Sequence, residues 1–153
     1  MPIAMHFKLR RAAIVDADAI AAVFSASFRL LTFLPSLHTV EEERWFIEKV
    51  VLRDCEVTVA EDQSGIVAFL ARHGEEVRLL YVHPRHLGLG AGTQLVEAAQ
   101  ASGTAALELW CFEANTPGRR FYEARGFRAV RFTDGTHNEE KMPDVRYRWE
   151  VRA

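Results

Sequence analysis

The chain has 153 residues, of which 49% are hydrophobic and 26% charged, a balance typical of one globular domain with a sizeable core. Its formal net charge of −2 lacks the basic excess of most nucleic-acid-binding proteins. The apolar runs are too short to cross a bilayer, and the N-terminus lacks a signal-peptide pattern. We therefore expect a cytoplasmic protein with neither a nucleic-acid nor a membrane partner.

The N-terminal half predicts a strand, two helices and a meander of three strands. Residues 6–10 alternate and predict the strand, after which Asp16 is expected to cap a helix with one apolar stripe. Thr39 and Glu42 have the spacing of a capping box and predict the start of the second helix. Short turns separate the next three apolar segments, which must therefore pair antiparallel. The strands of this meander are centred on residues 57–59, 66–71 and 77–82.

The C-terminal half predicts two more helices and three more strands. A helix follows a glycine-rich loop, and Thr116 is expected to cap the next helix, which Gly126 ends in a Schellman turn. The expected strands lie at residues 107–111, 127–132 and 145–151. The order β-α-α-β-β-β-α-β-α-β-β predicts a mixed α/β (α+β) fold over residues 1–153. We expect a single domain with a mostly antiparallel sheet of about six to seven strands and about four helices.

The glycine-rich loop places Gly88, Gly90 and Gly92 between a strand and a helix. Glycine tolerates positive φ, so backbone N–H groups can converge on an anion beside the positive end of the helix dipole. The loop predicts a pyrophosphate site, to which Thr93 could add a hydroxyl, although the glycines could instead serve only a tight turn. No Lys-Ser/Thr pair follows, which excludes a Walker loop, and the antiparallel meander disfavours a dinucleotide fold.

A second motif lies downstream, where Asn115, Phe121-Tyr122 and Gly126-Phe127 follow the next strand. The strand, glycine loop and helix together with this motif resemble the GNAT superfamily of N-acetyltransferases. The matching motifs span residues 77–132, and the element order extends the resemblance over the whole chain. The loop at residues 133–145 resembles small bacterial members of unassigned substrate. The resemblance implies acetyl-CoA as cosubstrate.

The resemblance also implies which residues bind that cosubstrate: the strand before the glycine loop would pair with the pantetheine arm, and the loop amides would hold the pyrophosphate. The implied residues are Leu80, Tyr81, Val82, Leu87, Gly88, Leu89, Gly90, Gly92, Thr93, Asn115 and Tyr122. The family usually has Gln or Arg where this chain has Leu87, so we expect the pyrophosphate to be bound mainly by backbone amides. Arg85, Arg119 or Arg120 could supply positive charge nearby.

The implied chemistry is direct attack of an amine on the thioester. The Val82 N–H would polarise the carbonyl, and Tyr122 would protonate the leaving thiolate, although its spacing also fits a core aromatic. Glu76 is our candidate for the general base, although it could be a solvated hairpin charge. His83, Glu108, His38 and ordered water are the alternatives. No cysteine or histidine pair has metal-ligand spacing, so no metal is expected, and Cys55 and Cys111 are predicted to be buried free thiols.

The acceptor is expected to be a primary amine of a small molecule or peptide. The acceptor-binding candidates are Phe28, Phe33, Leu34 and His38. Carboxylates of the late loop could attract a cationic amine, or the loop could be ordinary solvated surface. The carboxylates are those of Glu139, Glu140 and Asp144, and Asn138 of the same loop is a further acceptor candidate. A homodimer through the last strands is an expectation of the resemblance. The alternative functions are a CoA-binding sensor without turnover and a nucleotide-binding protein.

Overall fold

The computed structural model describes residues 6–152 and contains one seven-stranded mixed sheet, in the order β1-β2-β3-β4-β5-β7-β6. Its strands are β1 (Lys8–Arg11), β2 (Glu56–Asp62), β3 (Gly65–His73), β4 (Glu76–Val82), β5 (Ala106–Phe112), β6 (Arg128–Thr133) and β7 (Asp144–Glu150). Neighbouring strands run antiparallel except β4 and β5, which are parallel. The predicted fold class and element order are confirmed.

Four main helical segments accompany the sheet, two before the meander and two after it. The first are α1 (Ala17–Phe28) and a continuous helix made of α2 (Val40–Phe46), the π-helical η2 (Ile47–Val51) and α3 (Leu52–Asp54). The others are α4 (Ala91–Gln100) and α5 (Thr116–Ala124), and short 3₁₀ turns occur at η1 (Ile14–Asp16) and η3 (Pro84–His86). Within residues 6–152, no helix is both long and apolar enough to span a membrane.

Two of the predicted helix ends are confirmed. Thr39 and Glu42 form the expected capping box, with Glu42 N donating to Thr39 Oγ1 at 3.1 Å and Thr39 N to Glu42 Oε1 at 3.0 Å. The Schellman end of α5 is also present, since Phe127 N donates to Tyr122 O at 3.1 Å and Gly126 has a φ of 88°.

Two predicted caps and one strand boundary were wrong. Asp16 makes no side-chain cap on α1; its carboxylate instead accepts the Ala13 N–H at 2.8 Å and both ends of the Arg10 guanidinium at 2.9 Å. The first strand begins at Lys8 and ends at Arg11, so the expected strand at residues 6–10 is displaced. Asn115, rather than the adjacent Thr116, caps α5. The Asp16 carboxylate is unavailable as a cap because Arg10 and the Ala13 N–H engage it. The other two errors are shifts of one or two residues, where neighbouring positions offered a similar side chain or alternation.

The core has two clusters on opposite faces of the sheet. One joins strand residues to α4 and the inner side of α5, with Leu95, Leu107 and Tyr147 among its most buried members. The other packs α1 and η2 against β2 and β3, around Ile20, Ile47 and Phe69. Helices thus cover both faces of the sheet.

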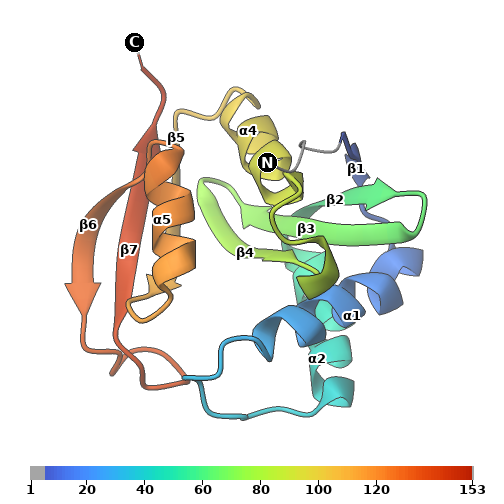
Figure 1. The fold of residues 1–153 in the computed structure, drawn as a ribbon, viewed down its shortest axis with the longest axis horizontal. Helices are drawn as coiled ribbons and strands as arrows, with labels where there is room; N and C mark the ends of the chain where they lie inside the picture. The colour runs from blue at the N-terminus through green and yellow to red at the C-terminus, as the bar shows by residue number, and fades with distance from the viewer. Residues whose placement is uncertain (1–5, 153) are drawn as a thin grey trace.

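β4 and β5 separate soon after they meet. In residues 6–152 they pair at a single position, Glu76 with Glu108. On its other edge, β4 has an extra residue, because Val77 pairs with Arg72 and Leu79 with Ala71, so that Arg78 forms a bulge. Figure 1 shows β5–β7 running in a clearly different direction from β2–β4, with α5 lying over β5 and β7. The sheet therefore opens between its two halves.

Candidate active site

The open edge of β4 presents backbone groups to the gap. The His83 N–H donates to Val67 O on the β3 side at 2.8 Å. Successive residues of a strand direct their N–H groups to opposite sides, so the N–H groups of Val82 and Leu80 face β5. The Val82 carbonyl accepts a hydrogen bond from Ser27 Oγ of α1 at 2.7 Å. The edge of the strand is thus held in place by α1 while its N–H groups point into the gap.

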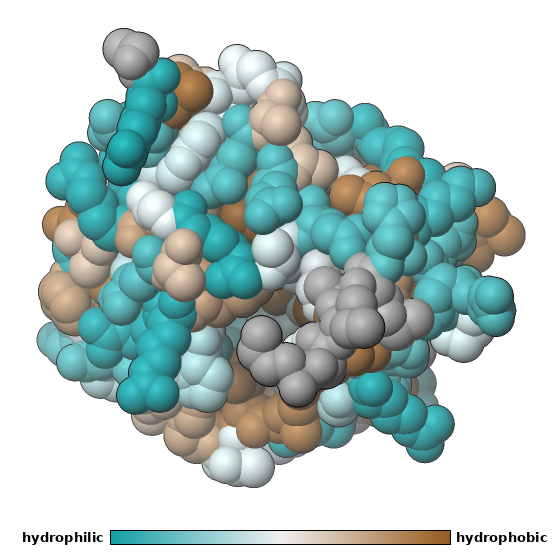
Figure 2. Space-filling model, turned by 45° about the horizontal axis from the view of Figure 1, so that its top comes forward, coloured by the Kyte–Doolittle hydropathy of each residue, from teal (hydrophilic) through white to brown (hydrophobic). Residues whose placement is uncertain are grey.

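A first cavity of about 510 Å³ occupies this gap. One wall is formed by β4 from Val77 to Val82, and the opposite wall by β5 and the start of α5. Among the predicted site residues, those lining it are Phe33, Leu80, Tyr81, Val82, Leu87, Gly92, Asn115 and Tyr122. The predicted cofactor residues of three separate chain segments therefore meet around one space. Figure 2 shows a hollow near the middle of one face of the molecule, with apolar side chains at its border and hydrophilic residues over much of the surrounding surface.

The glycine loop lies at one end of the first cavity and leads into α4. Gly90 occupies the N-cap position of α4 with a φ of 99°, a conformation that L side chains rarely adopt. Gly92 lies so close to α5 that a Cβ there would be 3.3 Å from the Phe121 ring. Leu87 is 56% exposed, and it can contact a ligand only from the rim. The N–H groups of the first turn of α4 are available in the way that anion sites require.

Arg125, which sequence reasoning missed, supplies positive charge beside this loop. Its Nε donates to Thr93 Oγ1 at 3.1 Å, and its guanidinium lies 3.9 Å from the centre of the Phe121 ring. Of the three arginines predicted for this role, Arg119 instead donates to Tyr147 Oη at 3.0 Å. The only sequence signal for Arg125 is its place just before the glycine that ends α5, and that signal does not show which way the side chain points.

Asn115 combines a structural contact with a place in the cavity lining. Its Oδ1 accepts the Gly118 N–H at 3.1 Å and so caps α5. A Cβ at Gly118 would lie 2.5 Å from Asn115 Nδ2, so the close approach of this side chain requires glycine there. The cap fixes the start of α5, and with it the position of Tyr122 two turns later.

Tyr122 lies in the first cavity among other aromatic rings. Its ring centre is 5.3 Å from that of Phe121 and 5.6 Å from that of Phe127. Burial, with a smaller contribution from Cys111, raises the pKa of the Tyr122 phenol. The hydroxyl makes no hydrogen bond to any residue in the described part of the chain. A phenol that stays protonated and faces a cavity can donate its proton to a developing anion.

Glu76, the predicted candidate base, and Glu108, one of its alternatives, are both engaged in ion pairs. Glu76 contacts Arg146 Nη1 at 2.9 Å and Arg78 Nε at 3.2 Å, and Glu108 contacts Arg146 Nε at 3.1 Å and also Arg148. Neither glutamate is among the residues that line the cavities on either side of β4. Hydrogen bonds from Arg146 and Arg148 lower the pKa of Glu108. Both carboxylates thus already have cationic partners outside the two cavities.

His83, one of the two histidines predicted as alternative bases, directs its ring toward the η3 turn. Its Nδ1 accepts the Arg85 N–H at 3.2 Å. Burial, followed by the nearby His86 and Arg85, lowers the pKa of His83. This side chain therefore serves mainly as a cap for η3.

A second cavity, of about 960 Å³, lies beyond β4 and shares lining with the first. The shared residues are Arg78, Leu79, Tyr81, Trp110 and Phe112. Phe28 and His38, both predicted acceptor residues, line this second cavity, whereas Phe33 lines the first and Leu34 lines neither. Two spaces thus meet at the point where the sheet opens, one beside the glycine loop and one beneath α1 and α2.

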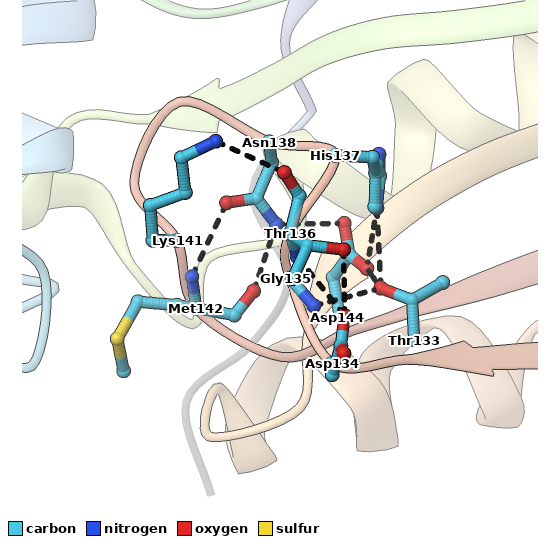
Figure 3. A network of polar contacts seen from close by, with 9 residues as sticks. All are labelled: Thr133, Asp134, Gly135, Thr136, His137, Asn138, Lys141, Met142 and Asp144. Carbon is cyan, nitrogen blue, oxygen red and sulfur yellow. Dashed lines mark hydrogen bonds and ion pairs between the residues drawn. The ribbon is translucent and has the colours of Figure 1, made fainter.

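The late loop forms one wall of the second cavity and is internally ordered, in contrast to a simple solvated loop. Asp144 is 3% exposed, and its carboxylate accepts hydrogen bonds from Thr133, from His137 at 2.9 Å and from Asn138 at 3.2 Å. Figure 3 shows these side chains converging on Asp144 from around the loop. A further contact crosses the mouth of the cavity, where His38 Nε2 lies 2.6 Å from Glu139 Oε1.

Both cysteines are free thiols, as predicted. Cys111 is buried and lines the first cavity, and burial raises its pKa to about 11. Cys55 is half-buried rather than fully buried, and burial also raises its pKa. Both groups stay protonated at neutral pH and are therefore poor nucleophiles. Among the described residues there is no group of three or more acidic, histidine or cysteine side chains suited to hold a metal ion.

Comparison with known proteins agrees with this geometry. The family model described as "Acetyltransferase (GNAT) domain" matches residues 53–129, half of the chain. A GCN5-related N-acetyltransferase structure from Rhodopseudomonas palustris aligns with a TM-score of 0.80 at 23% identity, covering 99% of both chains. Apo YjaB from Escherichia coli aligns with a TM-score of 0.78 at 22% identity, covering 97% of this chain and 100% of that one.

A third similar structure is that of YncA from Salmonella typhimurium, described as a putative acetyltransferase with its cofactor acetyl-CoA. It aligns with a TM-score of 0.72 at 17% identity, covering 97% of this chain and 96% of that one. At these identities the solved structures establish the fold alone. No protein of curated function matches the sequence.

Proposed function

Because the chain belongs to the GNAT family of acetyltransferases, we propose that it moves an acetyl group from acetyl-CoA to a primary amine of a small molecule or peptide. The observation that carries the proposal is the opening between β4 and β5. These strands pair at one position, and a cavity of about 510 Å³ separates them beside the N-terminus of α4. A strand edge with free N–H groups next to an anion-binding helix end suits a ligand with both an amide-containing arm and phosphates.

The groups around the first cavity match the parts of acetyl-CoA, with strand N–H groups for the pantetheine arm followed by loop amides for the phosphates. The N–H groups of Leu80 and Val82 face the gap and can pair with the amide groups of the pantetheine arm. The amides from Leu87 to Thr93 can hold the pyrophosphate, with the Arg125 guanidinium close to the same helix turn. The acetyl-CoA named in the description of the Salmonella structure supports the same choice of ligand.

The amine must reach the thioester as a free base, since an alkylamine with a pKa near ~10.4 is mostly ammonium at neutral pH. Its lone pair forms the new C–N bond, the C–S bond breaks, and the sulfur leaves as a thiolate. The Val82 N–H stabilises the charge on the carbonyl oxygen, and Tyr122 gives its proton to the thiolate. The amine proton passes to water in the cavities, because Glu76 is held by Arg78 and Arg146.

The replacement Tyr122→Phe tests this assignment. Removing the phenol proton should lower turnover by about 10²–10⁴-fold while leaving acetyl-CoA binding within a few fold. Thiol release with a panel of amines measures turnover, and thermal stabilisation by acetyl-CoA measures binding. Equal turnover in the variant would exclude Tyr122 as the acid. Wild-type protein that binds acetyl-CoA but acetylates no amine would favour a CoA sensor.

A further inference from the structure

The second cavity combines an aromatic wall with acidic side chains. Four aromatic residues of α1 and α2 face it from one side, namely Phe24, Phe28, Trp45 and Phe46. Phe24 forms the centre of this wall, because its ring centre lies 5.7 Å from Phe28, 6.1 Å from Phe46 and 5.2 Å from Tyr81. Such a surface suits the apolar body of a ligand, and aromatic faces also attract cations.

Most carboxylates around this cavity already have a partner. Glu43 is held by Arg29 and Ser25, Glu139 by His38, and Asp144 by the polar groups of the late loop. Glu42 is held by the backbone N–H of its capping box. The carboxylates without a hydrogen bond or ion pair to another described residue are those of Glu41 and Glu140.

Of these two, Glu140 is the less exposed, and it shares the second cavity with Tyr81. Glu41 is exposed at the mouth, whereas Glu140 is half-buried. Burial, with a smaller contribution from the Glu140 carboxylate, raises the pKa of Tyr81. Tyr81 lines both cavities, at the point where they join. The Asp144 network fixes the loop that carries Glu140 (Figure 3).

Resting on the acetyltransferase function proposed above, we infer that the acceptor is a cationic amine with an apolar, preferably aromatic, body and no carboxylate beside its nitrogen. Its ammonium group first pairs with Glu140, and its body packs against Phe24, Phe28 and Phe46. The amine nitrogen then lies beside Tyr81, where the second cavity opens toward the first. The nitrogen then gives a proton to water and attacks as the free amine. A free amino acid is disfavoured because its carboxylate would lie close to that of Glu140.

Three matched amines test the substrate class in a thiol-release assay with acetyl-CoA. 2-Phenylethylamine should have a kcat/KM at least about tenfold above that of ethylamine, because the phenyl group is removed from water. Phenylalanine differs from 2-phenylethylamine only by its carboxylate, and it should be worse by about tenfold or more. A preference for ethylamine or phenylalanine over 2-phenylethylamine would overturn the inference.

Two isosteric substitutions test the role of Glu140. Glu140→Gln should raise the KM for 2-phenylethylamine by about tenfold with a smaller change in kcat, since it removes one charge-assisted contact. Glu41→Gln removes an equal charge from the mouth of the same cavity and should change KM by less than about twofold. Equal changes of KM in both variants would indicate that the amine is attracted by the overall negative charge, and would refute a specific ion pair with Glu140. An unchanged KM in Glu140→Gln would refute it as well.

The failure of this inference is distinguishable from failure of the proposed function. If acetyl-CoA stabilises the protein and some amine is acetylated, but without dependence on Glu140 or on an apolar body, only the inference on the acceptor is wrong. If no amine in a broad panel is acetylated, the proposed function fails and the inference fails with it. Titration of the CoA-bound protein with 2-phenylethylamine gives a readout of binding that does not need turnover.

Discussion

Gly90 is the residue at which a single added methyl group should most directly damage the cosubstrate site. It is the N-cap of α4, with φ of 99° and ψ of 0°. An L-residue in a left-handed conformation costs about 1–2 kcal/mol more than glycine. The variant Gly90→Ala must either keep this strain or relax the loop. At 1.4 kcal/mol per factor of ten, the cost corresponds to about 5–30-fold in an equilibrium constant.

The two responses of Gly90→Ala can be separated by measuring both stability and affinity. If the loop keeps its shape, the strain lowers the melting temperature of the free protein by about 2–8 °C for a chain of this size. If the loop relaxes, the backbone N–H groups no longer converge and the Kd for acetyl-CoA rises by about 5–30-fold. Differential scanning calorimetry and isothermal titration calorimetry give the two quantities.

Leu87→Ala is the matched control for the same loop. The Leu87 side chain is 56% exposed. We expect main-chain amides, and not this side chain, to bind the pyrophosphate. This variant should therefore change the Kd by less than about twofold, within the range typical of surface substitutions. An unchanged melting temperature and Kd in Gly90→Ala, or a larger loss of affinity in Leu87→Ala, would refute the argument for a backbone cradle.

Three further predictions concern charged groups around the two cavities. The hydrogen bond to Glu139 raises the pKa of His38, so an NMR titration should show it above ~6.5 and Glu139→Gln should lower it. The bridge should thus stabilise the protein fully below pH ~6.5 and lose its effect as the pH rises through the raised pKa. Asp144→Asn should lower the free energy of unfolding by about 1–3 kcal/mol in urea, because the donors around this buried position lose their charged acceptor. An unchanged urea midpoint would contradict this. Arg125→Gln should weaken acetyl-CoA binding by about tenfold and reduce its sensitivity to salt, whereas an unchanged salt dependence would place the phosphates away from Thr93.

The element order could be predicted because its signals are local. The capping box of Thr39 and Glu42 and the Schellman end at Gly126 each depend on residues within one or two turns. Where two neighbours offered the same chemistry, as with Asn115 and Thr116, the sequence could not decide which would cap the helix. The cofactor residues followed from the resemblance, and the structure brings most of them around one cavity.

The features that sequence reasoning missed depend on contacts between distant segments. The Arg78 bulge is defined by the register of β4 against β3, and the sequence does not show where an extra residue enters a ladder. Arg125 meets Thr93 across 32 residues, and its neighbours along the chain give no hint of this contact. Glu140 was one of several loop carboxylates in the sequence, and only its unpaired state in the folded loop distinguishes it.

The opening between β4 and β5 also has a consequence for the folding cooperativity of the protein. Backbone pairing joins β1–β4 to β5–β7 at one position, so the two halves of the sheet communicate mainly through side chains and helices. A ligand whose amide groups pair with β4 would add hydrogen bonds at the strand edge that β5 leaves open. Acetyl-CoA should then slow amide exchange in β5–β7 as well as in β4, and the two halves should unfold more nearly as one unit. Bound acetyl-CoA would then contribute to the cooperative stability of the sheet.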